Sequence, residues 1–173
     1  MVISANEAQN TIVKKLEDDS TFPNNAALPL IIYKDAVRLE EGDASALEAL
    51  FRQNQWRSCW HNGIYPYHHY HSTAHEVLGI YQGSARLQMG GPDGIQAEVK
   101  TGDVIVIPAG VAHKNLGASH DFACVGAYPP GQNFDMNYGK VGERPEADQN
   151  IKQVAMPLSD PIYGEKGGLM QHW

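Results

Sequence analysis

The chain has 173 residues, and its 20 acidic against 13 basic side chains give a formal net charge of −7. This length fits one domain, and a composition of 42% apolar and 19% charged residues is typical of a globular protein rather than a disordered one. The acidic balance argues against non-specific binding to nucleic acid, which needs clustered Lys and Arg. No apolar run approaches the roughly 20 residues of a membrane-spanning helix. We therefore expect neither nucleic acid nor a membrane as a partner.

The two cysteines, Cys59 and Cys124, lack the spacing of a metal site or of a disulfide framework. We expect both to be reduced and the protein to be cytoplasmic. Cys124 lies on a late predicted strand, where it is expected to be a small buried side chain rather than a nucleophile.

The first elements in chain order are a strand and a helix. The apolar, β-branched run 28–33 predicts a strand that is entered by a proline. A helix is expected at about Ala44 to Gln53, because apolar residues recur there at helical spacing. Its buried face would consist of Leu47, Leu50 and Phe51. Its first turn could be capped by Ser45 and Glu48 in a capping box, or by Asp43.

From Trp56 to Tyr128 short apolar runs alternate with Gly- and Pro-rich turns. The predicted strands are 77–81, 84–89, 95–100, 104–107, 111–116 and 121–128. Val- and Ile-rich runs such as 104–107 suit strands that are covered on both faces. Many short strands at this spacing predict a β-sandwich or barrel. After residue 128 five prolines prevent a long helix, and the apolar residues that persist predict a segment wrapped around the barrel.

Histidine is the unusual residue, with eight in the chain and five of them between residues 61 and 75. His69 and His71 are two positions apart, so they would share one face of a strand. A short turn then leads to Glu76, which could return a carboxylate to the same interior, and a later strand adds His113. Three neutral imidazoles and one carboxylate suit one divalent transition metal ion such as iron, manganese, nickel or zinc.

At these residues the chain resembles the cupin superfamily. The first cupin motif is Gly, five residues, His-x-His, four residues, Glu, six residues, Gly, and every spacing is met. The matching residues are Gly63, His69, His71, Glu76 and Gly83.

The second motif is Gly, five residues, Pro-x-Gly, two residues, His, three residues, Asn. It is matched by Gly102, Pro108, Gly110 and His113. Gly117 stands where the motif has Asn, and Asn115 is out of register. That Asn is usually not a ligand in the superfamily, so the departure weakens the site little. Two spaced motifs in the right order are a strong signal.

The resemblance implies a mainly β fold, a double-stranded β-helix barrel of the jelly-roll type with one short helix and N- and C-terminal extensions. The whole chain, 1–173, would be one domain, with the motif-bearing core at about 56–128 and an extension at 129–173 that packs on the barrel. The metal would be bound inside by His69, His71, Glu76 and His113. Cupin barrels commonly pair through their outer sheets, which implies a homodimer.

The apolar outer positions Val77 and Tyr81 are compatible with such pairing. The whole chain, including the segments 22–25 and 171–173, also resembles a family of uncharacterised single-domain cupins, which supplies no reaction.

Other residues near the motifs receive plainer interpretations. His75 is expected at the surface or behind a ligand, His68 facing outward, and His61 in the core rather than behind a ligand. The aromatic residues Trp56, Trp60, Tyr65 and Tyr67 are expected to pack in the sandwich, with a substrate-stacking wall as the alternative. Arg57 and Arg86 are expected at the surface, and Asp103 in a structural turn.

Three functions fit this site. The leading hypothesis is a small-molecule metalloenzyme of the oxygenase type, in which open metal positions accept a substrate and dioxygen. The second is a non-redox isomerase or lyase acting on a sugar or keto acid, which needs a general base such as His61, His75 or Tyr67. The third is a non-catalytic small-molecule-binding cupin. The sequence leaves open whether the protein is an enzyme.

Overall fold

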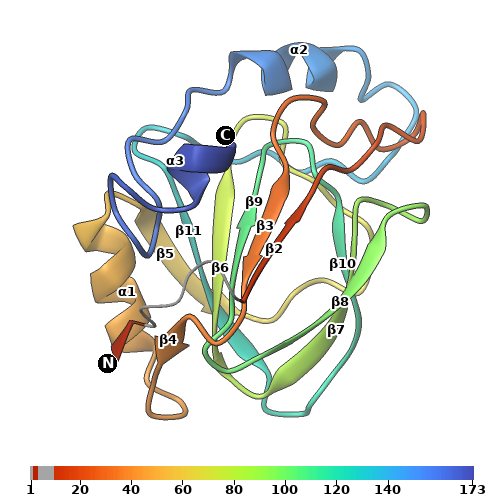
Figure 1. Ribbon diagram of the computed structural model, residues 1–173. Helices are drawn as coiled ribbons and strands as arrows, with labels where there is room; N and C mark the ends of the chain where they lie inside the picture. Colours follow the sequence, from red (N-terminus) through yellow and green to blue (C-terminus); the bar gives the residue numbers. More distant parts are fainter. Residues whose placement is uncertain (1, 4–9) are drawn as a thin grey trace.

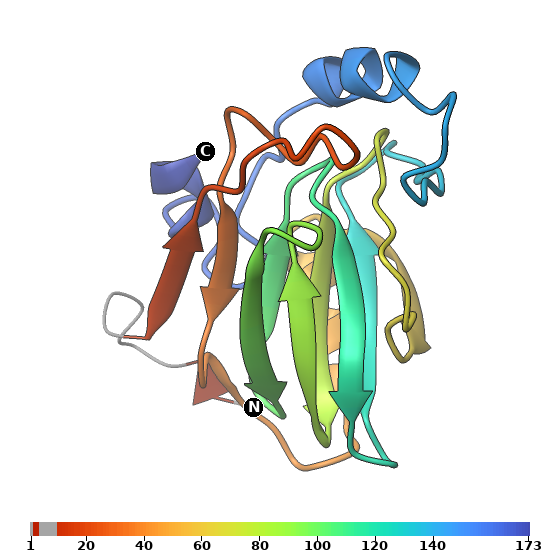
Figure 2. The ribbon, with the colours of Figure 1, turned by 90° about the vertical axis from the view of Figure 1, so that its right-hand side faces the viewer.

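The computed structural model describes residues 2–3 and 10–173, and its centre is a pair of antiparallel sheets packed face to face (Figures 1 and 2). The larger sheet has the strand order β2 (Thr11–Lys14), β3 (Leu30–Tyr33), β9 (Val104–Ile107), β6 (Glu76–Gln82), β11 (Ala123–Tyr128) and β5 (Arg57–Asn62). The smaller sheet has the order β10 (His113–Ala118), β7 (Ser84–Met89) and β8 (Ile95–Lys100). A separate two-stranded ribbon joins β1 (Val2–Ile3) to β4 (Val37–Arg38). This arrangement confirms the expected barrel of jelly-roll type.

The space between the sheets is filled by one apolar cluster. Leu78 of β6 lies opposite Ile105 of β9, and both side chains belong to this inner cluster. Leu87 and Met89 of β7 enter it from the smaller sheet. Because alternate residues of a strand share a face, Glu76 lies on the same inner face of β6 as Leu78. A carboxylate is therefore aimed into one end of an otherwise apolar interior.

The outer face of the large sheet is covered as well, as the Val- and Ile-rich runs predict. Val77 and its partner Val106 belong to a second cluster together with Leu47 and Phe51 of α1 (Ala44–Gln53). Val77 is fully buried there, and Tyr81 is half-buried against the same cluster. Val77 is therefore occupied within the chain, and Tyr81 is partly so. The homodimer itself stays a prediction.

Helix α1 has the predicted bounds and the predicted buried face. Its N-cap is Asp43, whose side chain accepts a hydrogen bond from the backbone N–H of Ser45 at 3.1 Å. The alternative capping box does not form, because the Glu48 side chain pairs with Arg52 and His61 instead.

The C-terminal segment wraps around the barrel, as expected from its apolar residues. It contains α2 (Glu146–Gln153) and α3 (Leu169–His172), of which α2 crosses one end of the barrel in Figure 1. Leu169 is buried in the outer cluster, and the indole N–H of Trp173 donates to the carbonyl of Pro29 at 2.9 Å. None of the helices in the described residues is long and apolar enough to cross a membrane.

Gly79 permits the close contact between α1 and β6. A Cβ atom at this position would lie 2.9 Å from side-chain carbons of both Leu47 and Phe51. We expect Gly79→Ala to lower the free energy of unfolding by about 1–3 kcal/mol, because two buried side chains must move to admit the methyl group. Urea unfolding followed by fluorescence would measure the change.

Gly117→Ala is the matched control, since Gly117 is also a strand residue but has no atom within 4 Å of the new Cβ. Equal stabilities of the two variants would contradict this account of the helix–sheet contact.

Candidate metal centre

Three histidines meet at one end of the barrel interior. His69 and His113 face each other as an isolated antiparallel bridge, in which each backbone N–H donates to the other residue's carbonyl, at 3.2 and 2.9 Å. This pairing places the two imidazoles with ring centroids 4.1 Å apart, and the His71 ring centroid lies 5.5 Å from that of His113. One ligating nitrogen of each residue lies within 4.8 Å of those of the other two. The predicted face-sharing of His69 and His71 therefore holds, although the segment that carries them is not a continuous strand.

Backbone carbonyls fix the orientation of all three rings. The Nδ1 atoms of His69, His71 and His113 lie 3.0, 2.6 and 3.1 Å from the carbonyl oxygens of residues 67, 135 and 111. A carbonyl can only accept, so each Nδ1 carries the proton and donates it. Each neutral ring then presents the lone pair of Nε2 to the shared space. This is the tautomer and the second hydrogen bond that metal-ligating histidines typically have.

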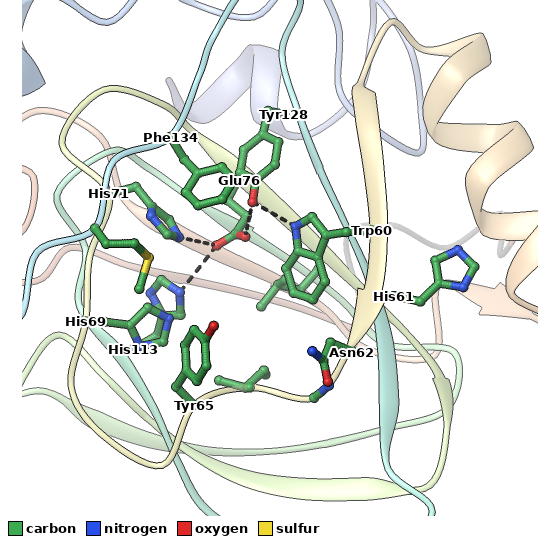
Figure 3. A pocket seen from close by; sticks show the side chains of 14 residues that line it. Trp60, His61, Asn62, Tyr65, His69, His71, Glu76, His113, Tyr128 and Phe134 are labelled. Carbon is green, nitrogen blue, oxygen red and sulfur yellow. Dashed lines mark hydrogen bonds and ion pairs between the residues drawn. The ribbon is translucent and has the colours of Figure 1, made fainter.

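Glu76 completes the cluster. Its side chain is only 2% exposed, and its Oε2 lies 3.3 Å from the Nε2 atoms of both His71 and His113. Oε1 accepts a hydrogen bond from the Tyr128 hydroxyl at 3.1 Å, and that hydroxyl accepts one from the indole N–H of Trp60 at 2.7 Å (Figure 3). Oε2 accepts no hydrogen bond from any residue that the structure describes. A buried carboxylate oxygen without a donor, beside the nitrogens of three clustered imidazoles, fits a bound cation.

The electrostatics of the cluster differ from one ligand candidate to the next. Burial and the neighbouring His113 lower the pKa of His69 to about 3, so this ring is neutral at neutral pH. Burial by itself would raise the pKa of Glu76, but His71 and His113 hold it well below its usual range. Burial also opposes a charge on His71, yet the adjacent Glu76 carboxylate raises the pKa of this imidazole. Without metal, a proton on His71 would balance the carboxylate, and a divalent ion would displace that proton.

The cluster opens onto a pocket of about 260 Å³. Besides the four site residues, it is lined by Trp60, His61, Asn62, Gly63, Ile64, Tyr65, Leu78, Tyr128, Phe134 and Met136. Trp60 owes its position to Gly126 on β11, because a Cβ atom there would lie only 2.1 Å from the indole ring. The absence of a side chain at Gly126 lets the indole pack directly against β11, where its N–H donates to the Tyr128 hydroxyl. The pocket gives a small molecule access to the open side of the histidine cluster.

The segment that follows β11 is the part of the site that the sequence analysis missed. Asp135 accepts hydrogen bonds from the backbone N–H and the hydroxyl of Ser72, and its carbonyl accepts from the imidazole of His71. Burial would raise the pKa of Asp135, but the bonds from Ser72 and Asn137 hold it below its usual value. This anchor carries Phe134 over the pocket, with its ring centroid 5.1 Å from that of His71. Nothing in the spacing of this segment signals the role, since it has no regular periodicity.

Tyr128 was also missed, although alternation along the predicted strand places it on the inner face with Cys124. Cys124 is fully buried, as expected, and burial raises the pKa of its thiol. Asp103 is the buried structural residue that was predicted, and it accepts from the backbone of Lys100 at 2.9 Å and pairs with Lys34.

Two other histidines depart from expectation. His75, which immediately precedes β6, is buried rather than at the surface, and its ring packs against Trp173 with centroids 4.7 Å apart. His61 is exposed rather than in the core, and it pairs with Glu48 of α1. In Figure 3 its ring points away from the histidine cluster. His68 is half-buried against Phe22, with ring centroids 5.3 Å apart.

The aromatic residues divide between the two interpretations. Trp56 is a core residue whose indole donates to the carbonyl of Ser159 at 3.0 Å. Trp60 and Tyr65 line the pocket, as the stacking-wall alternative requires. Tyr67 is exposed and stacks on Tyr65, with centroids 4.9 Å apart. Arg57 and Arg86 are exposed, as expected.

Comparisons with known proteins identify the family of the chain. A family model described as Cupin matches residues 55–133. An uncharacterised protein of Bacillus subtilis, YjlB, is 43% identical over 156 residues, which cover 90% of this chain and 92% of YjlB. Among solved structures, a DUF861 family protein of Thermotoga maritima is 18% identical with a TM-score of 0.35, covering 52% of this chain and 96% of that one. Acireductone dioxygenase of Bacillus anthracis, with cadmium in its active centre, is 14% identical with a TM-score of 0.42, covering 74% and 83%.

The chain therefore belongs to the cupin superfamily, as its motifs predicted. Gly117, where the second motif has Asn, lies at an irregularity in the pairing of β10 with β7 and is exposed. Its backbone N–H is bound by the side chain of Asn115 at 2.8 Å. The missing Asn thus leaves the histidine cluster untouched.

The Tyr128 hydroxyl holds Glu76 in the orientation that turns Oε2 toward the histidines. We expect Tyr128→Phe to weaken metal binding by about 10–100-fold, because loss of a hydrogen bond behind a ligand has this effect in metal sites. Competition of the metal-free protein with a coloured zinc chelator would measure it. Tyr138→Phe is the control, since Tyr138 is an exposed tyrosine that does not line the pocket. Equal zinc affinity of Tyr128→Phe and the wild type would refute the assigned role.

Proposed function

We propose that this protein is a metal-dependent enzyme of the oxygenase type that acts on a small organic molecule. One divalent transition metal ion would be held by His69, His71, His113 and Glu76. The observation that carries the proposal is the shared space between three inward Nε2 lone pairs and a buried carboxylate oxygen that has no hydrogen-bond donor. Three nitrogens and one oxygen are a ligand set for borderline metals such as iron, manganese, nickel and zinc.

Each residue has a defined part in this scheme. A redox-active metal bound here would supply a position for a substrate oxygen and for dioxygen, and the electrons that dioxygen activation needs. The three imidazoles would remain neutral donors, while Glu76 contributes the single negative charge of the set. Tyr128 would keep that carboxylate in place, and Trp60, Leu78 and Phe134 would limit the access of water to the reacting groups.

The composition of the pocket wall favours this proposal over non-redox isomerase or lyase chemistry. Such a reaction needs a general base within hydrogen-bond reach of the substrate. Of the bases considered from the sequence, His75 packs against Trp173, neither His75 nor Tyr67 lines the pocket, and His61 points away from the cluster (Figure 3). Beyond these, the described residues of the lining include no carboxylate or imidazole outside the four proposed ligands. The lining therefore favours a reaction that does not depend on a further histidine or carboxylate base.

The first test is the metal content of untagged protein purified without chelator and without added metal. Elemental mass spectrometry is expected to find about one transition metal ion per chain. The oxygenase proposal expects this ion to be iron. Glu76→Gln and His113→Ala should each lose most of this metal, because the first removes the charge and the second a nitrogen donor. His120→Ala is the matched control, since His120 is exposed and does not line the pocket.

The second test is dioxygen uptake by the iron-loaded protein with candidate substrates. Uptake that depends on substrate and is lost in Glu76→Gln supports the oxygenase proposal. Turnover that proceeds equally without oxygen would instead indicate Lewis-acid chemistry. Full metal content in both ligand variants would refute the site itself. A protein that binds metal and small molecules but turns none over would be a binding module.

A further inference from the structure

The pocket beside the histidine cluster has walls of a distinctive kind. Four of its lining residues outside the ligand set are aromatic: Trp60, Tyr65, Tyr128 and Phe134. Phe134 stacks on Tyr128, with centroids 5.1 Å apart and an interplanar angle of 21°. In Figure 3 this pair and Trp60 lie around Glu76, while Tyr65 lies across the pocket from them. Flat walls on more than one side suit a flat ligand.

The aromatic surface continues outward from the pocket. Tyr65 is 50% exposed and Phe134 is 47% exposed, which is high for residues of this size. Tyr65 stacks on Tyr67, whose ring centroid lies 5.8 Å from that of Tyr138. Both of these tyrosines are exposed. Half-exposed aromatic side chains gathered at one opening typically mark a binding surface rather than core packing.

The charge of the pocket lining restricts the charge that a ligand can carry. No Lys or Arg is among the lining residues in the part of the chain that the structure describes, and Glu76 is the charged group at its base. A phosphate or dicarboxylate would find no partner for its second charge there, and it would lie near the Glu76 carboxylate. A divalent metal balanced by Glu76 retains one positive charge. That charge matches one deprotonated oxygen.

We infer that this pocket takes a phenol-class ligand: a planar aromatic molecule with one ionisable hydroxyl directed at the histidine cluster and no other charge. The inference rests on the proposed function for the direction of the hydroxyl, because the oxygen would face the bound metal. The preference for an uncharged ring rests on the pocket walls alone. Asn62 is a polar residue of the lining on the side of the pocket away from His71 (Figure 3). Its Oδ1 accepts a hydrogen bond from the backbone N–H of Gly63.

The test compares two probes with the same ring system, 2-naphthol and 2-naphthalenesulfonate. Calorimetric titration of the metal-free protein is expected to give a Kd for 2-naphthol at least about tenfold below that for the sulfonate, since the sulfonate would have to bury an unpaired charge. Phe134→Ala and Tyr65→Ala should each weaken 2-naphthol binding by about tenfold through loss of a stacking wall. Both side chains are about half exposed, so the fold should tolerate their removal. Leu158→Ala, 66% exposed and outside the pocket lining, is the control.

A second measurement separates this inference from the proposed function. Zinc, which is redox-inert, is added to the complex, and the absorption of 2-naphthol is expected to change to that of its anion as the metal lowers the pKa of the bound hydroxyl. If zinc does not bind while the ring preference and the Phe134 dependence hold, the proposed function fails and the aromatic pocket stands. If zinc binds but 2-naphthol binds no better than the sulfonate, or binds Phe134→Ala as tightly as the wild type, the inference is overturned.

Discussion

The buried carboxylate of Glu76 is the constraint on which the rest of this structure depends. An ionised carboxylate inside an apolar barrel is costly unless hydrogen bonds or a cation compensate it. Here one oxygen is satisfied by Tyr128, and the other faces two imidazole nitrogens that have no proton to offer in their ligating tautomer. The arrangement is incomplete as protein chemistry alone. A divalent ion bound at the proposed site would complete it, because it would supply the positive charge that three neutral imidazoles lack.

The fold makes this arrangement rigid by covering both faces of the large sheet. The inner face of β6 carries Glu76 and then Leu78 into the space between the sheets, while Val77 on the other face is held under α1. A strand fixed on both sides cannot rotate to bring its carboxylate to solvent. The same burial disfavours a charge on His69, whose pKa it lowers together with the neighbouring His113 to about 3. Burial of this part of the sheet therefore contributes both to the packing of the fold and to the protonation state of the site.

Much of the barrel and the clustering of His69, His71, Glu76 and His113 could be predicted, because both depend on local spacing. Alternation along a strand places Glu76 inward, and the two motifs bring His113 back to His69 through a fixed turn length. The error about His75 arose from the same alternation: it put the side chain outside the barrel, but the C-terminal Trp173 covers that outside surface. Asp135 and Phe134 could not be predicted, because their roles depend on a non-periodic segment folding back over Ser72. Contacts of this kind are set by tertiary packing and leave no periodic signal.

The residues that could be predicted are the proposed metal ligands, whereas the groups that orient those ligands could not be predicted. Backbone carbonyls orient the three imidazoles, and any residue type could supply them, so the sequence carries no mark of residue 67, 111 or 135 in this role. Of these, the carbonyl at 135 comes from the segment that also carries Phe134 over the pocket. A change in that segment would therefore alter the orientation of His71 and the shape of the pocket together. The hydrogen bond between His71 and the carbonyl of Asp135 therefore links the orientation of one proposed ligand to the position of a pocket wall.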